Sequence, residues 1–150
     1  MLAAALLAGA SAAMALDPEA LDLFDRGTRK AKSGDHRGAI EDFTKVLKLA
    51  PNDAEAYYHR GLSREKSGDP QNAVEDFTGT LALNPKMEEA LYHRGLNKRK
   101  LGDYQGAVAD FTQALAINPK HADWHYDRGL AKWALGDDRG AIEDFTRALG

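Results

Sequence analysis

The sequence predicts an all-α fold made of stacked antiparallel helix hairpins, and three observations support this prediction. The first is a period of 34 residues: residues 54–87 and 88–121 agree at 21 of 34 positions. The second is a Gly-Asp pair at the same place in each copy, which is typical of a tight turn between two helices. The third is the helical spacing of apolar residues within each half-copy. Because one hairpin cannot bury its apolar face alone, the copies are expected to stack.

Four copies of this unit account for nearly all of the chain after its first residues. We place them at residues 20–53, 54–87, 88–121 and 122–150, so that residues 16–150 form one repeat array. The last copy is incomplete and has no polar cap, so its second helix should leave an apolar patch partly exposed. That patch consists of Ile142, Phe145 and Leu149. A truncated chain, a homodimer through this helix and a docked partner are the explanations that the sequence leaves open.

Residues 1–15 are interpreted as a cleaved signal peptide. Residues 1–16 carry no charged side chain, and the small-x-small run Ala13-Met14-Ala15 precedes the polar sequence that starts at Asp17. The front of the run has no positive residue besides the amino terminus, and the run is shorter than the roughly 20 apolar residues of a membrane span. We therefore expect export to the periplasm or the medium, with a membrane anchor or a cytoplasmic helix as the alternatives.

The composition argues against several classes of function. Of 150 residues, 43% are hydrophobic and 29% are charged, which is typical of a folded chain rather than a disordered one. The net charge of -3 gives no general attraction to nucleic acid. There is no cysteine, and no acid pair, activated nucleophile or phosphate loop has catalytic spacing. We therefore expect no enzyme activity, no cofactor, no metal, no nucleic acid and no small-molecule substrate.

The local signals predict two helices in each copy. In the second copy, the first helix should cover about residues 54–67 and end at Gly68, which accepts a left-handed conformation. Asp69 should cap the next helix, with Pro70 at its first position and its end near Leu83. The same pair of a helix-ending glycine and a capping aspartate recurs in the other copies as Gly34-Asp35, Gly102-Asp103 and Gly136-Asp137.

A glycine lies in the middle of every predicted first helix, where it costs about 0.5–1 kcal/mol relative to alanine. A cost that recurs in all four copies indicates that another element approaches closely at that column. In the second helices, alanine, phenylalanine and further apolar residues share one face. The glycines are Gly27, Gly61, Gly95 and Gly129, and the phenylalanines are Phe43, Phe77, Phe111 and Phe145.

These columns, with the Asn-Pro that ends two of the copies, resemble the tetratricopeptide repeat over residues 20–150. The resemblance implies a right-handed α-solenoid whose concave face is built from the first helices. It also implies a non-enzymatic scaffold that binds a protein or peptide of unknown identity in this groove, with a self-associating module or a subunit of a larger complex as alternatives. The columns that line the groove in the family correspond here to Phe24, Tyr58, His59, Leu62, Tyr92, His93, Leu96, Tyr126 and Leu130, with Trp133 one turn further on.

Two further interpretations of these groove residues stay open at this point. The tyrosines can instead fill the contacts between repeats, because aromatic residues at helical spacing often belong to a core. His59 and His93 are expected to be isolated, exposed histidines, because a metal site needs more ligands at close range.

The chain departs from the family pattern at two charged columns. An arginine precedes each mid-helix glycine, and a second cation follows one turn later, so like charges face each other. An aspartate precedes each phenylalanine of the second helices. We expect a ladder of Arg–Asp pairs within or between repeats, with an anion-binding stripe as the alternative. The three columns are Arg26, Arg60, Arg94 and Arg128; Lys30, Arg64, Lys98 and Lys132; and Asp42, Asp76, Asp110 and Asp144.

Overall fold

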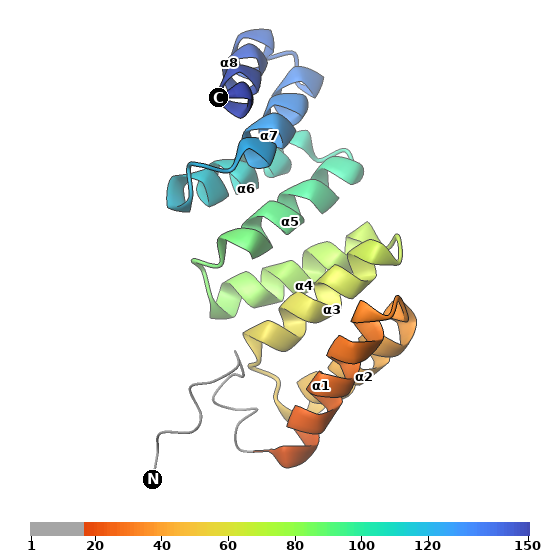
Figure 1. Cartoon of the computed structure of the whole chain (residues 1–150). Helices are drawn as coiled ribbons and strands as arrows, with labels where there is room; N and C mark the ends of the chain where they lie inside the picture. The colour runs from red at the N-terminus through yellow and green to blue at the C-terminus, as the bar shows by residue number, and fades with distance from the viewer. Residues whose placement is uncertain (1–16) are drawn as a thin grey trace. The chain divides into compact units, whose positions relative to one another are not determined.

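The computed structural model describes residues 17–150, and this part is entirely helices and short turns (Figure 1). The predicted all-α fold is therefore confirmed, while the predicted signal peptide, residues 1–15, lies outside the described residues. In the described range no helix has both the length and the apolar character needed to cross a membrane. The helices are α1 (Pro18–Lys32), α2 (His36–Leu49), α3 (Ala54–Lys66), α4 (Pro70–Leu83), α5 (Glu88–Lys100), α6 (Tyr104–Ile117), α7 (Ala122–Ala134) and α8 (Asp138–Leu149).

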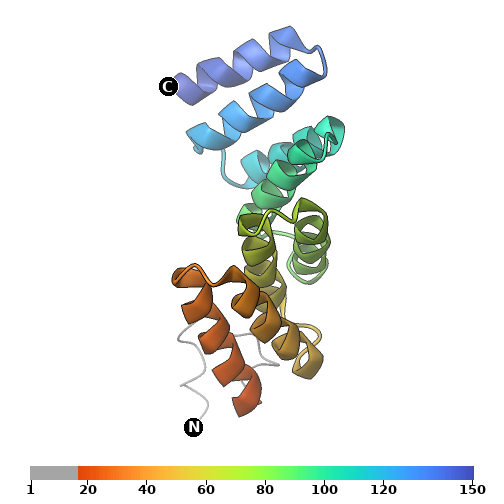
Figure 2. The same cartoon turned by 90° about the vertical axis from the view of Figure 1, so that its right-hand side faces the viewer.

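The chain forms two compact units, and each consists of two stacked helix hairpins. The first unit ends at Pro85 and the second runs from Lys86 to Gly150. In the first unit α1 pairs with α2 and α3 with α4, and α2 packs on α3. In the second unit α5 pairs with α6 and α7 with α8, and α6 packs on α7. The antiparallel pairing of α7 with α8 is visible from both directions (Figures 1 and 2).

The turn within each hairpin has the chemistry that the sequence predicts. Gly68 has φ +77, in the left-handed region that only glycine adopts without strain. The Asp69 carboxylate accepts a hydrogen bond from the Asn72 amide at 3.2 Å, which caps α4. Glycines and capping aspartates do the same in the other three hairpins. The predicted ends of α3 and α4 are therefore confirmed to within one residue.

The mid-helix glycines make room for phenylalanine rings. A Cβ atom at Gly61 would lie 2.9 Å from the Phe77 ring, and one at Gly95 would lie 2.7 Å from Phe111. Both rings are fully buried. The predicted close approach is confirmed, and its partner is a ring of the second helix rather than a neighbouring backbone. This contact fixes the separation of the two helices in each hairpin.

Each hairpin is also joined by one buried aspartate that binds two cations. In the first hairpin, Arg26 Nε and Nη2 donate to the two Asp42 oxygens at 2.9 and 2.6 Å, and Lys30 Nζ lies 2.8 Å from Asp42 Oδ2. The same arrangement recurs in the other three hairpins. The predicted ladder is confirmed, with every Arg–Asp pair inside one hairpin. The alternative of an anion-binding stripe stays a prediction, because each buried aspartate binds both of its cations but carries one negative charge against their two positive charges.

Candidate protein-binding surface

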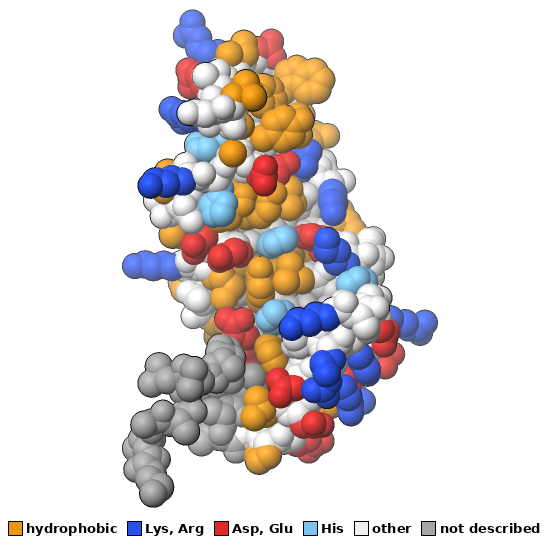
Figure 3. Space-filling model, in the orientation of Figure 1, with side chains coloured by type: hydrophobic (Ala, Val, Ile, Leu, Met, Phe, Trp, Pro, Cys, Tyr) orange, Lys and Arg blue, Asp and Glu red, His pale blue; other side chains and the backbone are white. Residues whose placement is uncertain are grey.

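The first helices of the hairpins carry an apolar face with interspersed histidines. Figure 3 shows hydrophobic and histidine side chains gathered where these helices lie, in each unit. All ten residues predicted to line the groove lie on α1, α3, α5 or α7. The first two of these helices belong to the first unit and the last two to the second, so each unit carries its own half of the predicted surface.

In the first unit, three of the predicted residues pack against each other and against the hairpin core. Phe24 meets Phe43 and His59 edge-on, at centroid distances of 5.4 and 5.3 Å. His59 stacks on Phe43 at 5.8 Å, and Tyr58 lies 6.0 Å from Phe77. The Phe24, Tyr58 and His59 rings are half-buried and offer only part of their surface to a partner.

The expectation of an exposed His59 is wrong. The imidazole is half-buried against two phenylalanine rings, and this burial lowers its pKa. Its Nε2 atom lies 3.8 Å from Glu55 Oε2, which is too far for a hydrogen bond. His59 is therefore a neutral packing residue near neutral pH, and its outer edge borders Leu62 in a small surface hollow.

In the second unit, Tyr92 joins two hairpins. Its ring stacks on Trp124 of α7 at a centroid distance of 5.1 Å and an interplanar angle of 19°. Its hydroxyl donates to Asp127 Oδ2 at 2.8 Å. The alternative role that the sequence left open, padding between repeats, therefore applies to this tyrosine. Sequence reasoning missed Trp124, and the available signal was that alanine occupies its column in the two preceding copies, as Ala56 and Ala90.

Two other predicted residues of the second unit face solvent. Tyr126 is 51% exposed and Trp133 is 64% exposed. Leu130, which lies between these two residues in the sequence, is half-buried. Leu96 packs partly against the core, and the centroid of the His93 ring lies 5.5 Å from that of Tyr92. The accessible apolar surface of this unit therefore lies mainly on α7.

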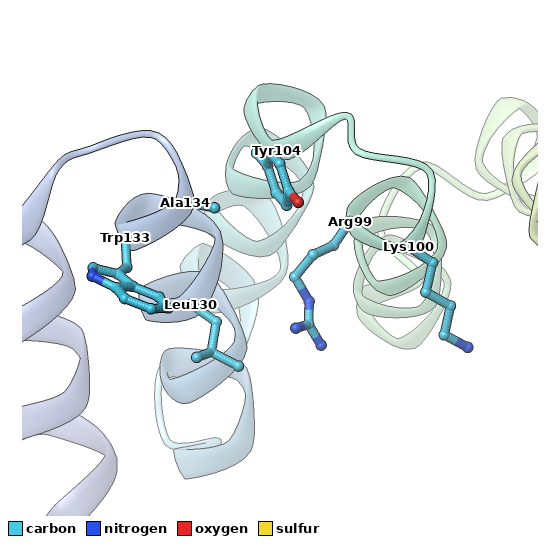
Figure 4. Close-up of a pocket in the computed structure, with 6 residues that line it drawn as sticks. All are labelled: Arg99, Lys100, Tyr104, Leu130, Trp133 and Ala134. Carbon is cyan, nitrogen blue, oxygen red and sulfur yellow. The ribbon is translucent and has the colours of Figure 1, made fainter.

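A hollow of about 290 Å³ opens between the turn ends of α5 and α7, and we call it the α5–α7 hollow. In Figure 4, Trp133 and Leu130 project from α7, Arg99 extends from α5, and the Tyr104 hydroxyl points to the side of Arg99. Its lining consists of Arg99, Lys100, Tyr104, Leu130, Trp133 and Ala134. Sequence reasoning included Leu130 and Trp133 but missed Arg99 and Tyr104, which differ from their counterparts in the earlier copies.

The last helix presents an apolar patch, as predicted. Ile142 is 64% exposed and Leu149 is 91% exposed, whereas Phe145 is half-buried because its ring lies against Gly129 and 5.5 Å from Tyr126. An open hollow beside Ile142 and Phe145 reaches Trp133. Between residues 17 and 150 no group of three or more histidine, cysteine or acidic side chains is placed to hold a metal ion.

Comparisons with known proteins point to one kind of repeat. Residues 24–88 match the family described as Tetratricopeptide repeat, and residues 95–136 match the family described as TPR repeat. The comparison with curated proteins found no match.

Solved structures with a similar fold include two described as MamA. The crystal structure of MamA protein is 30% identical, with a TM-score of 0.85 over 87% of this chain and 72% of that chain. MamA 41-end from Desulfovibrio magneticus RS-1 is 26% identical, with a TM-score of 0.83 over 87% of this chain and 73% of that chain. YrrB, described as a TPR protein with an unusual peptide-binding site, is 22% identical, with a TM-score of 0.82 over 91% of this chain and 71% of that chain.

Proposed function

This chain belongs to the tetratricopeptide repeat family, and we propose that it is a non-enzymatic scaffold that binds a protein or peptide partner on the face formed by its first helices. The observation that carries the proposal is the exposed apolar surface of α7, where Tyr126 and Trp133 face solvent beside the half-buried Leu130. The three residues are spaced i, i+4 and i+7 along α7 and so share one face, and a contiguous exposed apolar patch is typical of an interaction site. YrrB, a structure of the same fold, is described as having a peptide-binding site.

The rest of the first-helix face divides into supporting and contacting residues. Phe24, His59 and Tyr92 hold neighbouring helices in place through ring contacts, so they support the surface more than they contact a partner. Tyr126 and Trp133 offer large rings with few rotatable bonds, which lose little entropy on binding. We therefore assign direct contact to these two residues, together with Leu62 and Leu130.

A capture experiment with two matched double variants tests this assignment. The full chain is used as bait against an extract of the host cell, with bound proteins quantified by mass spectrometry. One bait carries Leu62→Ala with Tyr126→Ala, on the first helices α3 and α7. The control carries Leu83→Ala with Ile117→Ala, two exposed positions on the second helices α4 and α6. We expect partners to be lost from the first bait and retained by the control. Partners that bind both baits equally would overturn the proposed surface.

Self-association through α8 is a second candidate function, supported by the exposure of Ile142 and Leu149. A specific contact elsewhere in each unit adds to this. Arg60 Nη1 of α3 donates to Thr44 Oγ1 of α2 at 3.1 Å, and Arg128 of α7 donates to Thr112 of α6 at 3.2 Å. Thr146 occupies the same column in α8 and is exposed. The face of α8 that carries Thr146 could therefore accept the arginine of a first helix from a second copy of the chain.

Light scattering of residues 16–150 tests the second candidate. We expect concentration-dependent self-association, as a dimer through α8 or as head-to-tail chains, that Ile142→Glu weakens and that Ile117→Glu on α6 leaves unchanged. A strict monomer at millimolar concentration would overturn self-association and would leave the proposed partner surface on α7 untouched.

We also propose export of the chain, on the composition of residues 1–15 alone. Amino-terminal sequencing of the protein purified from its host is expected to start at Leu16. A mature protein that begins at Met1 would contradict cleavage.

A further inference from the structure

The α5–α7 hollow has a counterpart in the first unit, and the two differ in chemistry. The counterpart lies between α1 and α3 and has a volume of about 80 Å³, against about 290 Å³ for the α5–α7 hollow. Four pairs of lining residues are separated by 68 positions, which is two repeats. These pairs are Ala31 and Arg99, His36 and Tyr104, Leu62 and Leu130, and Lys66 and Ala134. The same place in the fold is therefore enlarged and rebuilt in the second unit.

The side chains that distinguish the α5–α7 hollow are a cation and two aromatic rings. Arg99 stands where the first unit has Ala31, and Trp133 stands where it has Glu65. Arg99 and Lys100 both line the hollow, and the lining contains no acidic side chain. The Trp133 indole, 64% exposed, supplies an uncovered aromatic surface next to Leu130, which lies between it and Arg99 in Figure 4. A site with this lining favours a ligand that is both anionic and apolar.

Arg99 is held in position before any ligand arrives. Its Nη2 donates to Asp127 Oδ1 at 2.9 Å, and the other oxygen of Asp127 accepts from the Tyr92 hydroxyl at 2.8 Å. Asp127 offsets part of the Arg99 charge, but a guanidinium has five N–H donors, and this hydrogen bond uses one of them. The Arg99 Nε atom is buried without an acceptor in the described part of the chain, whereas the side chain as a whole is 30% exposed, so the ligand would meet the terminal nitrogens. The exposed Lys100 adds a second positive charge at the rim.

We propose that the α5–α7 hollow binds an acidic side chain of an extended partner peptide together with the bulky apolar side chain next to it. The inference rests on the proposed scaffold function and names the partner chemistry for one part of that surface. The carboxylate would meet Arg99, which Figure 4 shows extending toward Leu130, and the apolar side chain would cover Trp133 and Leu130. A volume of about 290 Å³ lies at the small end of ligand sites, which suits one or two side chains rather than a cofactor.

Two blocked peptides provide the probe. The first is acetyl-Gly-Glu-Leu-Glu-Leu-Gly-amide, and its twin carries glutamine in place of both glutamates. Each is titrated into the full chain while the indole N–H signal of Trp133 and the backbone amide signals of Leu130 and Ala134 are followed by NMR. Trp133→Phe assigns the indole signal against that of Trp124. We expect saturable shifts with the glutamate peptide and affinity about fivefold lower for the twin, a factor typical of an exposed ion pair.

Three variants locate the binding. Arg99→Gln should weaken the glutamate peptide about fivefold and bring it level with its twin. Trp133→Glu installs the residue of the first-unit counterpart and should weaken the glutamate peptide more than the twin. Lys32→Gln removes one positive charge at the first-unit counterpart of Lys100 and should change neither affinity. If Arg99→Gln fails to fold, two measurements still test the proposal. These are the comparison of the two peptides on the natural chain and the effect of Trp133→Glu, which lies at an exposed position.

Several results would overturn the proposal. One is the absence of any saturable shift at Trp133, Leu130 or Ala134 up to millimolar peptide, and another is equal affinity for the two peptides. Equally strong binding of a short single-stranded oligonucleotide would show attraction to any anion rather than recognition of an acidic peptide. Failure here is distinguishable from failure of the scaffold function, because the capture experiment substitutes Leu62 and Tyr126, which do not line this hollow.

Discussion

Arg60 and Asp76 form a two-point ion pair that closes the second hairpin. Arg60 Nη2 donates to Asp76 Oδ1 at 2.7 Å and Arg60 Nε donates to Asp76 Oδ2 at 3.0 Å, while Arg64 Nη1 lies 2.9 Å from Asp76 Oδ2. The Asp76 side chain is buried, so its charge depends on these two cations for stabilisation. Without it, the two arginines would face each other one helical turn apart. The aspartate thus makes the unusual arginine columns of this chain compatible with a stable hairpin.

Asp76→Ala should therefore destabilise the protein strongly. Removing the acid leaves two partly buried cations without a partner, and breaking a buried pair in this way costs about 3 kcal/mol. Urea unfolding followed by circular dichroism measures the loss. Glu75→Ala, at the exposed neighbouring position, is the control and should change the free energy of unfolding by less than about 0.5 kcal/mol. Equal stability of both variants would contradict the structural role of the ladder.

Acid should weaken the first hairpin through Asp42. The hydrogen bonds from Arg26, together with Lys30, lower the pKa of Asp42 to about 2 from an ordinary value near 3.8. Because the folded pKa is the lower one, the stabilisation is complete above about pH 4 and is lost as the pH falls from 4 through 2. Its size is about 1–2 kcal/mol, since one pKa unit is about 1.4 kcal/mol and solvent at the partly exposed Arg26 weakens the pair.

The measurement for Asp42 is the free energy of unfolding between pH 2 and pH 6, for the natural chain and for Asp42→Asn. The variant should be less stable at pH 6, and the difference between the two proteins should shrink as the pH approaches 2. A difference that stays constant over this range would show that Asp42 stabilises the hairpin by packing rather than by charge.

His59 should add a second pH dependence in a different range. Burial lowers its pKa below the ordinary value of 6.5, so the unfolded chain binds a proton that the folded chain does not. Stability contributed by the neutral ring is present above pH 6.5 and is lost as the pH falls through the folded pKa. His59→Phe keeps a ring between Phe24 and Phe43 and removes the titration. We expect the variant to lose the slope of stability below pH 6.5, and an unchanged slope would contradict this explanation.

The hairpins themselves were predictable because their signals are local. Gly68 and Asp69 set a helix end and a cap by their own backbone and side-chain chemistry, without help from distant residues. The Arg60–Asp76 pair followed from two charged columns, because antiparallel helices bring such columns together. These features need only the period and the order of residues along one copy.

The burial of each residue on the first-helix face was harder to predict, because it depends on neighbouring residues in other copies. His59 lies on the expected face, yet the ring of Phe24 from the preceding copy covers it. Tyr92 shares its column with the exposed Tyr126, but Tyr92 is covered by Trp124 of the next first helix, whereas no first helix follows α7 in the described chain. The α5–α7 hollow depends on Arg99, Tyr104 and Trp133 together, and these residues lie in two columns that hold a different residue in each of the four copies. Column reasoning averages over the copies and so loses such differences.

Gly95→Ala tests the contact that sets the spacing of the third hairpin. The new methyl group would lie 2.7 Å from the buried Phe111 ring, and a tightly packed core does not relax easily. We expect a loss of about 1–3 kcal/mol, even though alanine favours the helix itself. Phe111→Leu should be destabilising alone, but the double variant should recover part of the Gly95→Ala loss, because the smaller side chain makes room. Strictly additive losses would show that the two positions do not share one packing contact.

Tyr92→Phe and Tyr126→Phe form a matched pair that separates support from contact. Each change removes only a hydroxyl, but the Tyr92 hydroxyl donates to Asp127, whereas Tyr126 is half exposed. Tyr92→Phe should lower the free energy of unfolding by about 1 kcal/mol, and Tyr126→Phe should leave it unchanged. Without the Tyr92 hydrogen bond, Asp127 should become more mobile and should hold Arg99 less firmly. This change is measurable by NMR as broadening of the Arg99 Nε–H signal. If the two variants are equally stable and that signal stays sharp, Tyr92 does not position Arg99, and its role is limited to stacking on Trp124.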